Sequence, residues 1–145
     1  MDTEIEGMLR GGPFKRLMEE QSAELRQKYD LKKAELDILY FLSRSGQHNT
    51  STDIHQQLMM NRGHISQAID QLCRRNYLIA IPDEHDRRYI HYKIADSAQG
   101  LIAELTERRE EINQQILKGI SEEEWQVFLQ IFEKIRTNID ELIDE

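Results

Sequence analysis

Residues 50–94 decide the fold, and they read TSTDIHQQLMMNRGHISQAIDQLCRRNYLIAIPDEHDRRYIHYKI. Up to residue 76 the apolar residues recur every three or four positions, which is typical of amphipathic helices. Beyond residue 76, two short runs rich in β-branched and aromatic residues flank a charged loop, which is typical of a β-hairpin. The stretch therefore predicts two helices followed by two antiparallel strands.

The two predicted helices are delimited by residues that favour helix ends. Thr50 is followed three residues later by Asp53, which matches a capping box. After a turn at residues 59–60, Asn61 is a suitable cap for the second helix. Asn76 can adopt the left-handed backbone conformation that closes it. The inward-facing residues are Ile54, Leu58 and Met59 in the first helix, and Ile65, Ala68, Ile69 and Leu72 in the second.

Two such helices and a hairpin together predict a winged helix-turn-helix. In this motif the second helix enters the major groove of DNA and the first helix supports it. Because the apolar side faces the body, the polar positions in between are left for base edges and phosphates. These candidate DNA contacts are Asn61, Arg62, His64, Ser66, Gln67 and Gln71. Among them, Gln67 is suited to adenine and Arg62 to guanine.

The hairpin strengthens the prediction of DNA binding. Residues 77–81 form the first apolar strand, residues 88–94 alternate as a partner strand, and Asp86-Arg87-Arg88 lies near the tip. Arginine at such a tip can enter the minor groove, while Asp86 can hold one arginine in a set orientation. The alternative is an ordinary helical hairpin with a solvated polar face, in which Asp86 only neutralises its neighbours.

Helical patterns flank this stretch on both sides. They cover residues 14–29, residues 32–43 with a nearly continuous apolar run, and residues 97 to the end with a break at 118–121. The last segment carries an apolar seam at heptad-like spacing: Trp125, Phe128, Phe132, Ile135, Ile139 and Leu142. A small domain cannot cover such a seam alone, which favours a homodimer. Packing against a matching stripe within the chain is the alternative, and both can hold: Leu101, Leu105, Ile112 and Ile116.

Charge is unevenly distributed along the 145 residues. The chain has a formal net charge of −8, yet residues 61–93 carry six basic and four acidic side chains. Residues 95–145 carry five basic and thirteen acidic ones. One basic segment on an acidic body indicates a localised anion-binding face rather than a general affinity for polyanions.

Several other classes of site are disfavoured. The single cysteine, Cys73, allows no disulfide within the chain and is expected to be a packing residue. The histidines show no metal-ligand spacing, and His85 and His91 are expected to approach phosphates or solvent. No catalytic motif, cofactor motif or membrane-spanning run is present, and the acidic N-terminus does not match a signal peptide. We therefore expect a cytoplasmic protein without metal or cofactor that is not an enzyme.

Three segments resemble the MarR (multiple antibiotic resistance regulator) family of bacterial transcriptional regulators. They are NRGHISQAIDQLCRRNYL at 61–78, PDEHDRRYIHYKI at 82–94 with its Asp-Arg-Arg signature, and DSAQG at 96–100, the start of the long helix after the wing. The resemblance covers about residues 31–105. Asn76 stands where the family usually has glycine, and Gln67 replaces a frequent arginine.

The resemblance implies a mainly α fold with a small β-hairpin wing, a winged helix-turn-helix with N- and C-terminal dimerisation helices. It divides the chain into an arm and dimerisation helix (1–30), a DNA-binding domain (31–95) and C-terminal dimerisation helices (96–145). It also implies a homodimeric, ligand-responsive repressor on a pseudo-palindromic operator of double-stranded DNA, with half-sites about 34 Å apart. A small anionic or aromatic effector would bind beside Phe14, Met18, Tyr40 and Phe41, unless these residues belong to the core.

A second function also agrees with the composition. The acidic C-terminal helices are compatible with a winged-helix module that binds a protein partner instead of DNA. Salt-sensitive DNA binding distinguishes the two functions, because phosphate contacts release counterions.

Overall fold

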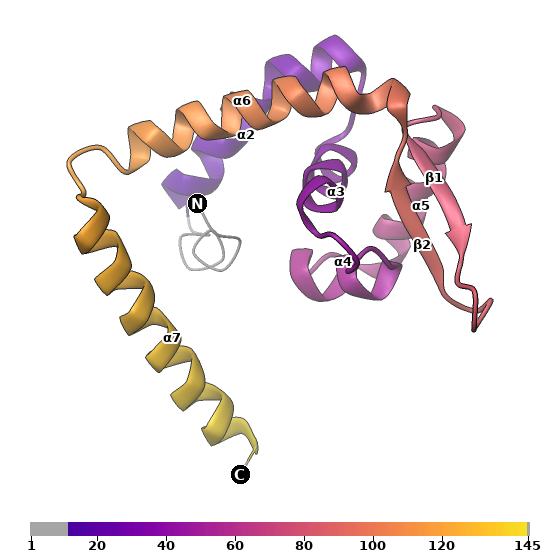
Figure 1. The fold of residues 1–145 in the computed structure, drawn as a ribbon. Helices are drawn as coiled ribbons and strands as arrows, with labels where there is room; N and C mark the ends of the chain where they lie inside the picture. Colours follow the sequence, from indigo (N-terminus) through magenta and orange to yellow (C-terminus); the bar gives the residue numbers. More distant parts are fainter. Residues whose placement is uncertain (1–11, 145) are drawn as a thin grey trace. The chain divides into compact units, whose positions relative to one another are not determined.

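The computed structural model describes residues 12–144, so most of the expected N-terminal arm lies outside the described residues. Figure 1 shows the elements α2 (Gly12–Tyr29), α3 (Lys33–Arg44), α4 (Ser51–Leu58), α5 (Arg62–Arg74), β1 (Leu78–Pro82), β2 (Ile90–Ile94), the 3-10 turn η1 (Asp96–Ala98), α6 (Gln99–Ile116) and α7 (Glu122–Asp144). The predicted mainly α class with one antiparallel hairpin is confirmed. The chain divides into two compact units after Glu110, and each is considered by itself.

The core of the first unit is built around α3. This helix buries four large apolar residues, Leu36, Ile38, Leu39 and Leu42, as its nearly continuous apolar run predicts. Its one buried carboxylate, Glu35, accepts a hydrogen bond of 2.8 Å from the backbone N–H of Lys32, which caps the helix. Core residues of α5 and α6 join the same cluster: Ile65, Ala68, Ile69, Leu72, Leu101 and Leu105.

The helix ends predicted from the sequence are confirmed. The Thr50 hydroxyl accepts the N–H of Asp53 at 3.2 Å, and the Asp53 carboxylate accepts the N–H of Thr50 at 3.0 Å. The Asn61 side chain accepts the N–H of Gly63 at 2.7 Å and caps α5. Asn76 follows α5 with a φ of 61°, in the left-handed region. These side chains satisfy backbone groups that a helix end leaves unpaired.

The hairpin pairs β1 with β2 in antiparallel register from Leu78 with Ile94 to Pro82 with Ile90. The second strand begins two residues later than the sequence predicts. Arg88 and Tyr89 belong to the turn instead, because their backbone N–H groups bind the carboxylate and the carbonyl of Asp86, at 3.1 Å each. One side-chain bond and one backbone bond within the turn thus replace two ladder positions.

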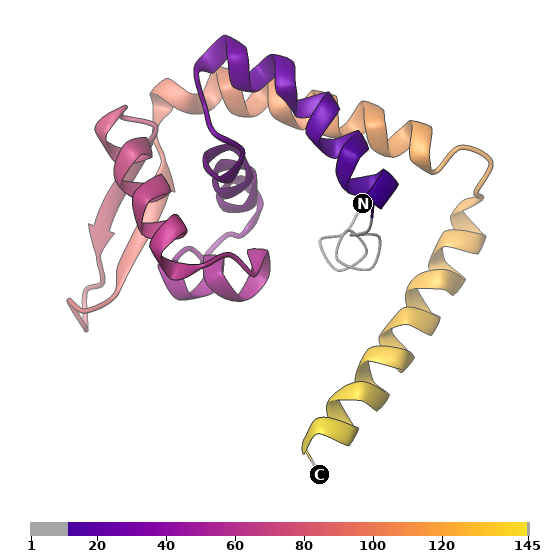
Figure 2. The ribbon, with the colours of Figure 1, turned by 180° about the vertical axis from the view of Figure 1, so that it is seen from behind.

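Figures 1 and 2 show α2 and the first part of α6 side by side. Glu104 of α6 accepts bonds from the Lys28 ammonium at 2.7 Å and from the Tyr29 hydroxyl at 2.8 Å. These two donors lower the pKa of the Glu104 carboxyl. At the same end of α2, the guanidinium of Arg75, just beyond α5, donates to the backbone carbonyls of Tyr29 and Asp30. The end of α2 is thereby joined to both α6 and α5.

The second unit comprises the last turns of α6 and all of α7. Gly119, with a φ of 84°, allows the break between them, and Ser121 caps α7 by accepting the N–H of Glu124 at 3.1 Å. Within residues 122–144, all of which the structure describes, no side chain is buried. Over the described residues, 12–144, no helix is both long enough and apolar enough to cross a membrane.

Candidate DNA-binding surface

The helix-turn-helix consists of α4 and α5, and burial of one face orients α5. Its apolar residues Ile65, Ala68, Ile69 and Leu72 are buried. Because these positions recur every three or four residues, the opposite face turns outward. All the polar side chains predicted to meet DNA are exposed on it: Asn61, Arg62, His64, Ser66, Gln67 and Gln71. Asn61 is occupied as the cap, so its Oδ1 is already bonded within the helix end.

The turn between α4 and α5 is fixed by backbone and side-chain bonds. Met59 adopts a left-handed conformation, with a φ of 52°, and its N–H donates to the His55 carbonyl at 3.0 Å. The His55 ring contacts the Met60 carbonyl at 2.7 Å through Nδ1. The sequence prediction placed Met59 inward, but its side chain is exposed, because the left-handed turn directs it away from the core. The turn therefore sets the angle at which α5 follows α4.

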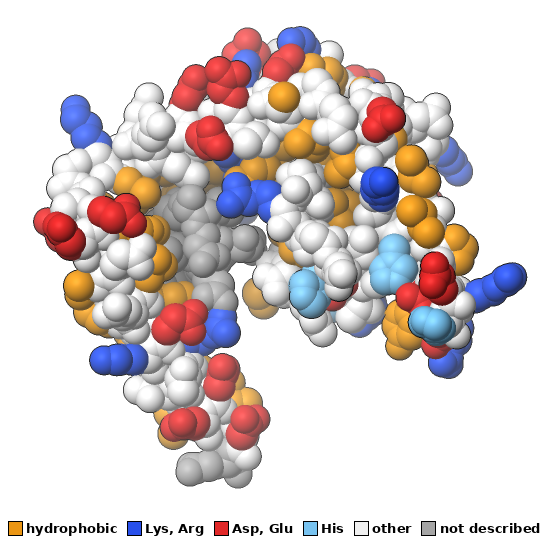
Figure 3. All heavy atoms as spheres, viewed as in Figure 1, with side chains coloured by type: hydrophobic (Ala, Val, Ile, Leu, Met, Phe, Trp, Pro, Cys, Tyr) orange, Lys and Arg blue, Asp and Glu red, His pale blue; other side chains and the backbone are white. Residues whose placement is uncertain are grey.

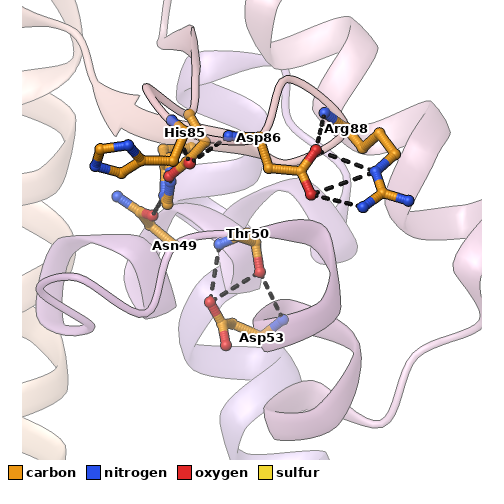
Figure 4. Close-up of polar contacts among 8 residues, drawn as sticks. Asn49, Thr50, Asp53, His85, Asp86 and Arg88 are labelled. Carbon is orange, nitrogen blue, oxygen red and sulfur yellow. Dashed lines mark hydrogen bonds and ion pairs between the residues drawn. The ribbon is translucent and has the colours of Figure 1, made fainter.

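The wing presents two arginines near its tip. The Arg88 guanidinium donates to the Asp86 carboxylate, with Nε 3.0 Å from Oδ1 and a terminal nitrogen 2.8 Å from Oδ2. This hydrogen bond lowers the pKa of Asp86 and raises that of Arg88. The Arg88 side chain is nevertheless 87% exposed, and Arg87 is exposed as well. Figure 4 shows the Asp86 carboxylate facing the Arg88 guanidinium, so this arginine is oriented while remaining accessible.

Three further residues connect the wing to the helix-turn-helix. His91 on β2 contacts the Asn49 Oδ1 atom through Nδ1 at 2.6 Å and the Asp83 Oδ1 atom through Nε2 at 2.8 Å. The other oxygen of Asp83 accepts the N–H groups of His85 and Asp86, at 3.0 and 2.9 Å. These bonds, the one from His91 foremost, lower the pKa of Asp83 to about 2.

The expectation that His91 approaches phosphates or solvent is therefore wrong, because both of its ring nitrogens are engaged within the protein. Asn49 and Asp83 were not singled out from the sequence. A hairpin with the predicted register brings residues 83 and 91 near each other, so the sequence could have indicated the Asp83–His91 contact. No sequence signal indicates Asn49, which lies 42 residues from His91.

Comparison with known proteins shows which domain family and which solved structures the chain resembles. Residues 31–98 match the family described as the winged helix DNA-binding domain. Similar solved structures include Staphylococcus aureus MepR in its DNA-binding conformation (TM-score 0.74, 20% identity, 86% of this chain and 92% of that one) and Streptococcus pneumoniae FabT in complex with DNA (0.66, 19%, 89% and 91%). The transcriptional regulator SlyA is also similar (0.69, 16%, 87% and 88%). No curated protein sequence matches the chain.

Residues 31–98 therefore form a winged helix DNA-binding domain, and the chain shares the fold of MepR, FabT and SlyA. The fold predicted from the three sequence segments is thereby confirmed. The wing, α4 and α5 all lie inside the matched residues 31–98.

The residues predicted to bind an effector lie in two helices. Phe14 and Met18 are half-buried in the first turns of α2, whereas Tyr40 and Phe41 pack from α3 against the core cluster. Two guanidinium carbons also lie close to the Tyr40 ring: that of Arg109 is 4.7 Å from the ring centroid, and that of Arg44 is 5.5 Å from it.

The structure also bears on a reactive thiol and on a metal site, both of which the sequence disfavours. Cys73 is half-buried on α5, and burial, assisted by Asp70, raises the pKa of its thiol. A raised thiol pKa disfavours the reactive thiolate, which agrees with a packing role. Across residues 12–144, no three His, Cys, Asp or Glu side chains are grouped in a way that suits a metal ion.

Proposed function

We propose that this regulator binds a pseudo-palindromic operator as a homodimer and represses transcription, with α5 in the major groove and the wing arginines at the minor groove. The observation that carries the proposal is the exposed, polar face of α5 combined with the exposed but oriented Arg88 on the adjacent wing. Such a protein acts on the chromosome, in the bacterial cytoplasm, and requires no catalytic activity.

Within the groove we assign two kinds of contact. Arg62 and Gln67 read base edges, since their side chains offer the bidentate pairings suited to guanine and adenine. His64, Ser66 and Gln71 bind phosphates or bases beside them. The exposed start of α5, where backbone N–H groups point outward, favours a phosphate. Arg87 and Arg88 add phosphate or minor-groove contacts from the wing.

The proposed homodimer forms through residues 1–30 and 96–145, which flank the DNA-binding domain at 31–95. Support comes from α7, whose large apolar side chains are exposed in the single chain: Val127, Phe128, Ile131, Ile135, Ile139, Leu142 and Ile143. Exposed apolar stripes of this extent mark protein interfaces. A second copy of the same stripe covers it symmetrically, and the two-fold axis then sets the two recognition helices on successive half-sites.

Ligand response is a further part of the proposal. The half-buried Tyr40 ring has two guanidinium groups near it, and a planar anion beside the ring would contact these cations and stack on an aromatic surface. We expect aromatic carboxylates such as benzoate to lower operator affinity and Tyr40→Ala to reduce that response. An operator affinity insensitive to a panel of such anions would remove this part of the proposal and leave DNA binding intact.

The main test is a fluorescence anisotropy titration of the protein with the DNA upstream of its own gene, at several salt concentrations. Arg88→Ala should weaken binding about tenfold on every sequence and reduce the salt slope. Arg16→Ala is the matched control, because Arg16 is an exposed arginine paired with a carboxylate, Glu20, at 3.0 Å on α2. Equal affinities for R88A and R16A would contradict the role of the wing.

The alternative partner is a protein bound through the acidic C-terminal helices. One observation favours it, since α7 opens with Glu122, Glu123 and Glu124 and exposes apolar residues. Stoichiometric co-purification of a protein that leaves the chain monomeric would support this alternative. A salt-sensitive complex with DNA and a stable homodimer would contradict it.

A further inference from the structure

The turn between α4 and α5 holds a residue in an unusual backbone conformation. Met59 has a φ of 52°, in the left-handed region, where the Cβ atom comes too close to the following carbonyl oxygen. Within residues 12–144, the other non-glycine residues with a positive φ are Asp30 and Asn76, whose short polar side chains tolerate this conformation. Methionine has no such compensation, so the turn keeps a strained residue where glycine would be free of strain.

The side chain of Met59 also points away from the protein. Its neighbours Leu58 and Met60 pack against the core, whereas Met59 is 81% exposed. This outward position is fixed, because the Met59 N–H donates to the His55 carbonyl at 3.0 Å and the His55 ring contacts the Met60 carbonyl at 2.7 Å. An apolar side chain is thus held in solvent at a strained backbone position, and neither feature stabilises the free protein.

Met59 lies next to the proposed DNA contacts. Asn61 caps α5 and Arg62 begins it, so both follow Met59 within three residues. Three residues of chain span at most about 11 Å, which is close to the width of the major groove, about 12 Å. The exposed face of α5 is polar, and Figure 3 shows charged and histidine side chains gathered around the wing. Met59 therefore adds an apolar group beside the polar face of α5.

The major groove of a duplex carries one apolar group that a side chain can contact, the 5-methyl group of thymine. We propose that Met59 contacts this methyl group and gives the protein a preference for thymine at one position of each half-site. The proposal rests on the proposed entry of α5 into the major groove, and it adds a base-reading residue that lies before α5. Contact with DNA removes the exposed methionine from water, which offsets the strain of the turn in the complex.

The first experiment compares two versions of the DNA upstream of the gene, one synthesised with thymine and one with uracil, which pairs in the same way but lacks the methyl group. In anisotropy titrations the wild-type protein should bind the uracil duplex about fourfold more weakly for each half-site, as expected when one buried methyl group is lost. Met59→Gly should bind the thymine duplex more weakly than the wild type does and should bind both duplexes equally. Met59→Leu keeps an apolar side chain and should retain most of the difference.

Ile79→Ala is the matched control. Ile79 is an exposed apolar residue, at 48%, but it lies on β1 rather than in the turn. Its loss should leave the ratio of the two affinities at the wild-type value. Replacing thymines by uracil one at a time then locates the contact, and the effect should fall on one position of each half-site and disappear in M59G.

Other outcomes of these measurements would overturn the proposal. Wild-type protein that binds both duplexes equally would show that no thymine methyl group is contacted. A difference that persists in M59G, or that I79A abolishes to the same extent, would place its origin elsewhere. A dimer that M59G dissociates in sedimentation velocity would assign Met59 to a protein interface instead of DNA.

The second experiment needs no DNA and so separates this proposal from the proposed function. Because the left-handed conformation is strained for methionine and not for glycine, Met59→Gly should raise the urea midpoint of unfolding. A lower midpoint would show that Met59 stabilises the fold, which would overturn the proposal. If neither duplex binds the wild-type protein in a salt-sensitive way, the proposed function fails and the thymine contact fails with it. Salt-sensitive binding without a preference for thymine rejects only the contact of Met59.

Discussion

Two helices of this protein, α5 and α7, are amphipathic and exposed, yet they present opposite faces. In α5 the apolar side is buried in the first unit and the exposed side carries Arg62, His64 and Gln67. In α7 no side chain is buried, and the exposed set includes Ile131, Ile135 and Ile139. Outward-facing polar groups on a helix are solvated by water or can bind a polyanion. Outward-facing isoleucine side chains are stabilised by contact with another apolar surface.

Charge separates the two regions in the same way. Residues 61–93 have more basic than acidic side chains, whereas residues 111–145 carry nine acidic and three basic ones. An acidic surface on the second unit is unfavourable for nucleic acid, which agrees with the proposal that DNA contacts the wing and α5. In the proposed function, α5 binds DNA and α7 binds a second copy of the chain, and the predictions below test that division.

The largest effect is expected from a charge placed in the exposed stripe of α7. Ile135 is 48% exposed in the single chain, so Ile135→Glu should cost the monomer little stability. In the proposed dimer the same glutamate is desolvated without a partner and should weaken association at least about a hundredfold. Sedimentation velocity measures the dissociation constant. Gln130→Glu adds the same charge at another exposed position of α7 and is the control. An equal weakening of the dimer by this substitution would contradict the proposal that the apolar stripe forms the dimer interface.

The polar face of α5 should show a smaller and sequence-dependent effect. Gln67→Ala removes a proposed base contact and should cost about tenfold in affinity for the operator while leaving affinity for random DNA unchanged. Competition titrations with operator and random duplexes measure the ratio. A uniform loss on both duplexes would show that Gln67 binds the phosphate backbone instead.

Loss of the cap of α4, the helix that supports α5, should lower the free energy of unfolding by about 1 kcal/mol. Thr50→Ala removes the hydroxyl that accepts the Asp53 N–H at 3.2 Å and should lower the free energy of unfolding by that amount. Urea denaturation followed by circular dichroism checks it. Thr50→Ser keeps the acceptor and should retain most of the stability. A T50S protein as unstable as T50A would mean that the methyl group, not the cap, matters.

The smallest effect is expected at the end of α5. Asn76 has a φ of 61°, which glycine adopts without strain. Asn76→Gly should raise the free energy of unfolding by about 0.5 kcal/mol, and Asn76→Ala should lower it by about 1 kcal/mol, because alanine is disfavoured in the left-handed region. The same denaturation experiment measures both variants. A loss of stability with glycine, or a gain with alanine, would contradict the backbone explanation.

Most of the fold follows from local signals in the sequence. The caps at Thr50 and Asn61 and the left-handed Asn76 are predictable because each depends on residues within three or four positions. The buried face of α5 is predictable because periodicity reports which side of a helix is covered. The exposed set on α5 follows from the same period.

Contacts between distant segments were not predictable. Periodicity indicates that a face is buried but does not identify what covers it. The hydrogen bonds from Lys28 and Tyr29 to Glu104 therefore could not be predicted from the sequence. The same holds for His91, whose partner Asn49 belongs to a loop without any pattern. Met59 was placed inward because it continued an apolar spacing, but the left-handed turn ended the helix at that residue.

Arg75 connects the end of α2 to the end of α5. Its guanidinium donates to two successive carbonyls, those of Tyr29 and Asp30, at the point where α2 ends. It also lies over the Tyr77 ring, 4.9 Å from the centroid, at the start of the wing. A single side chain thus connects α2, the end of α5 and the start of the wing. Any displacement of α2 along its axis would therefore either move the end of α5 with it or break two hydrogen bonds to the same guanidinium.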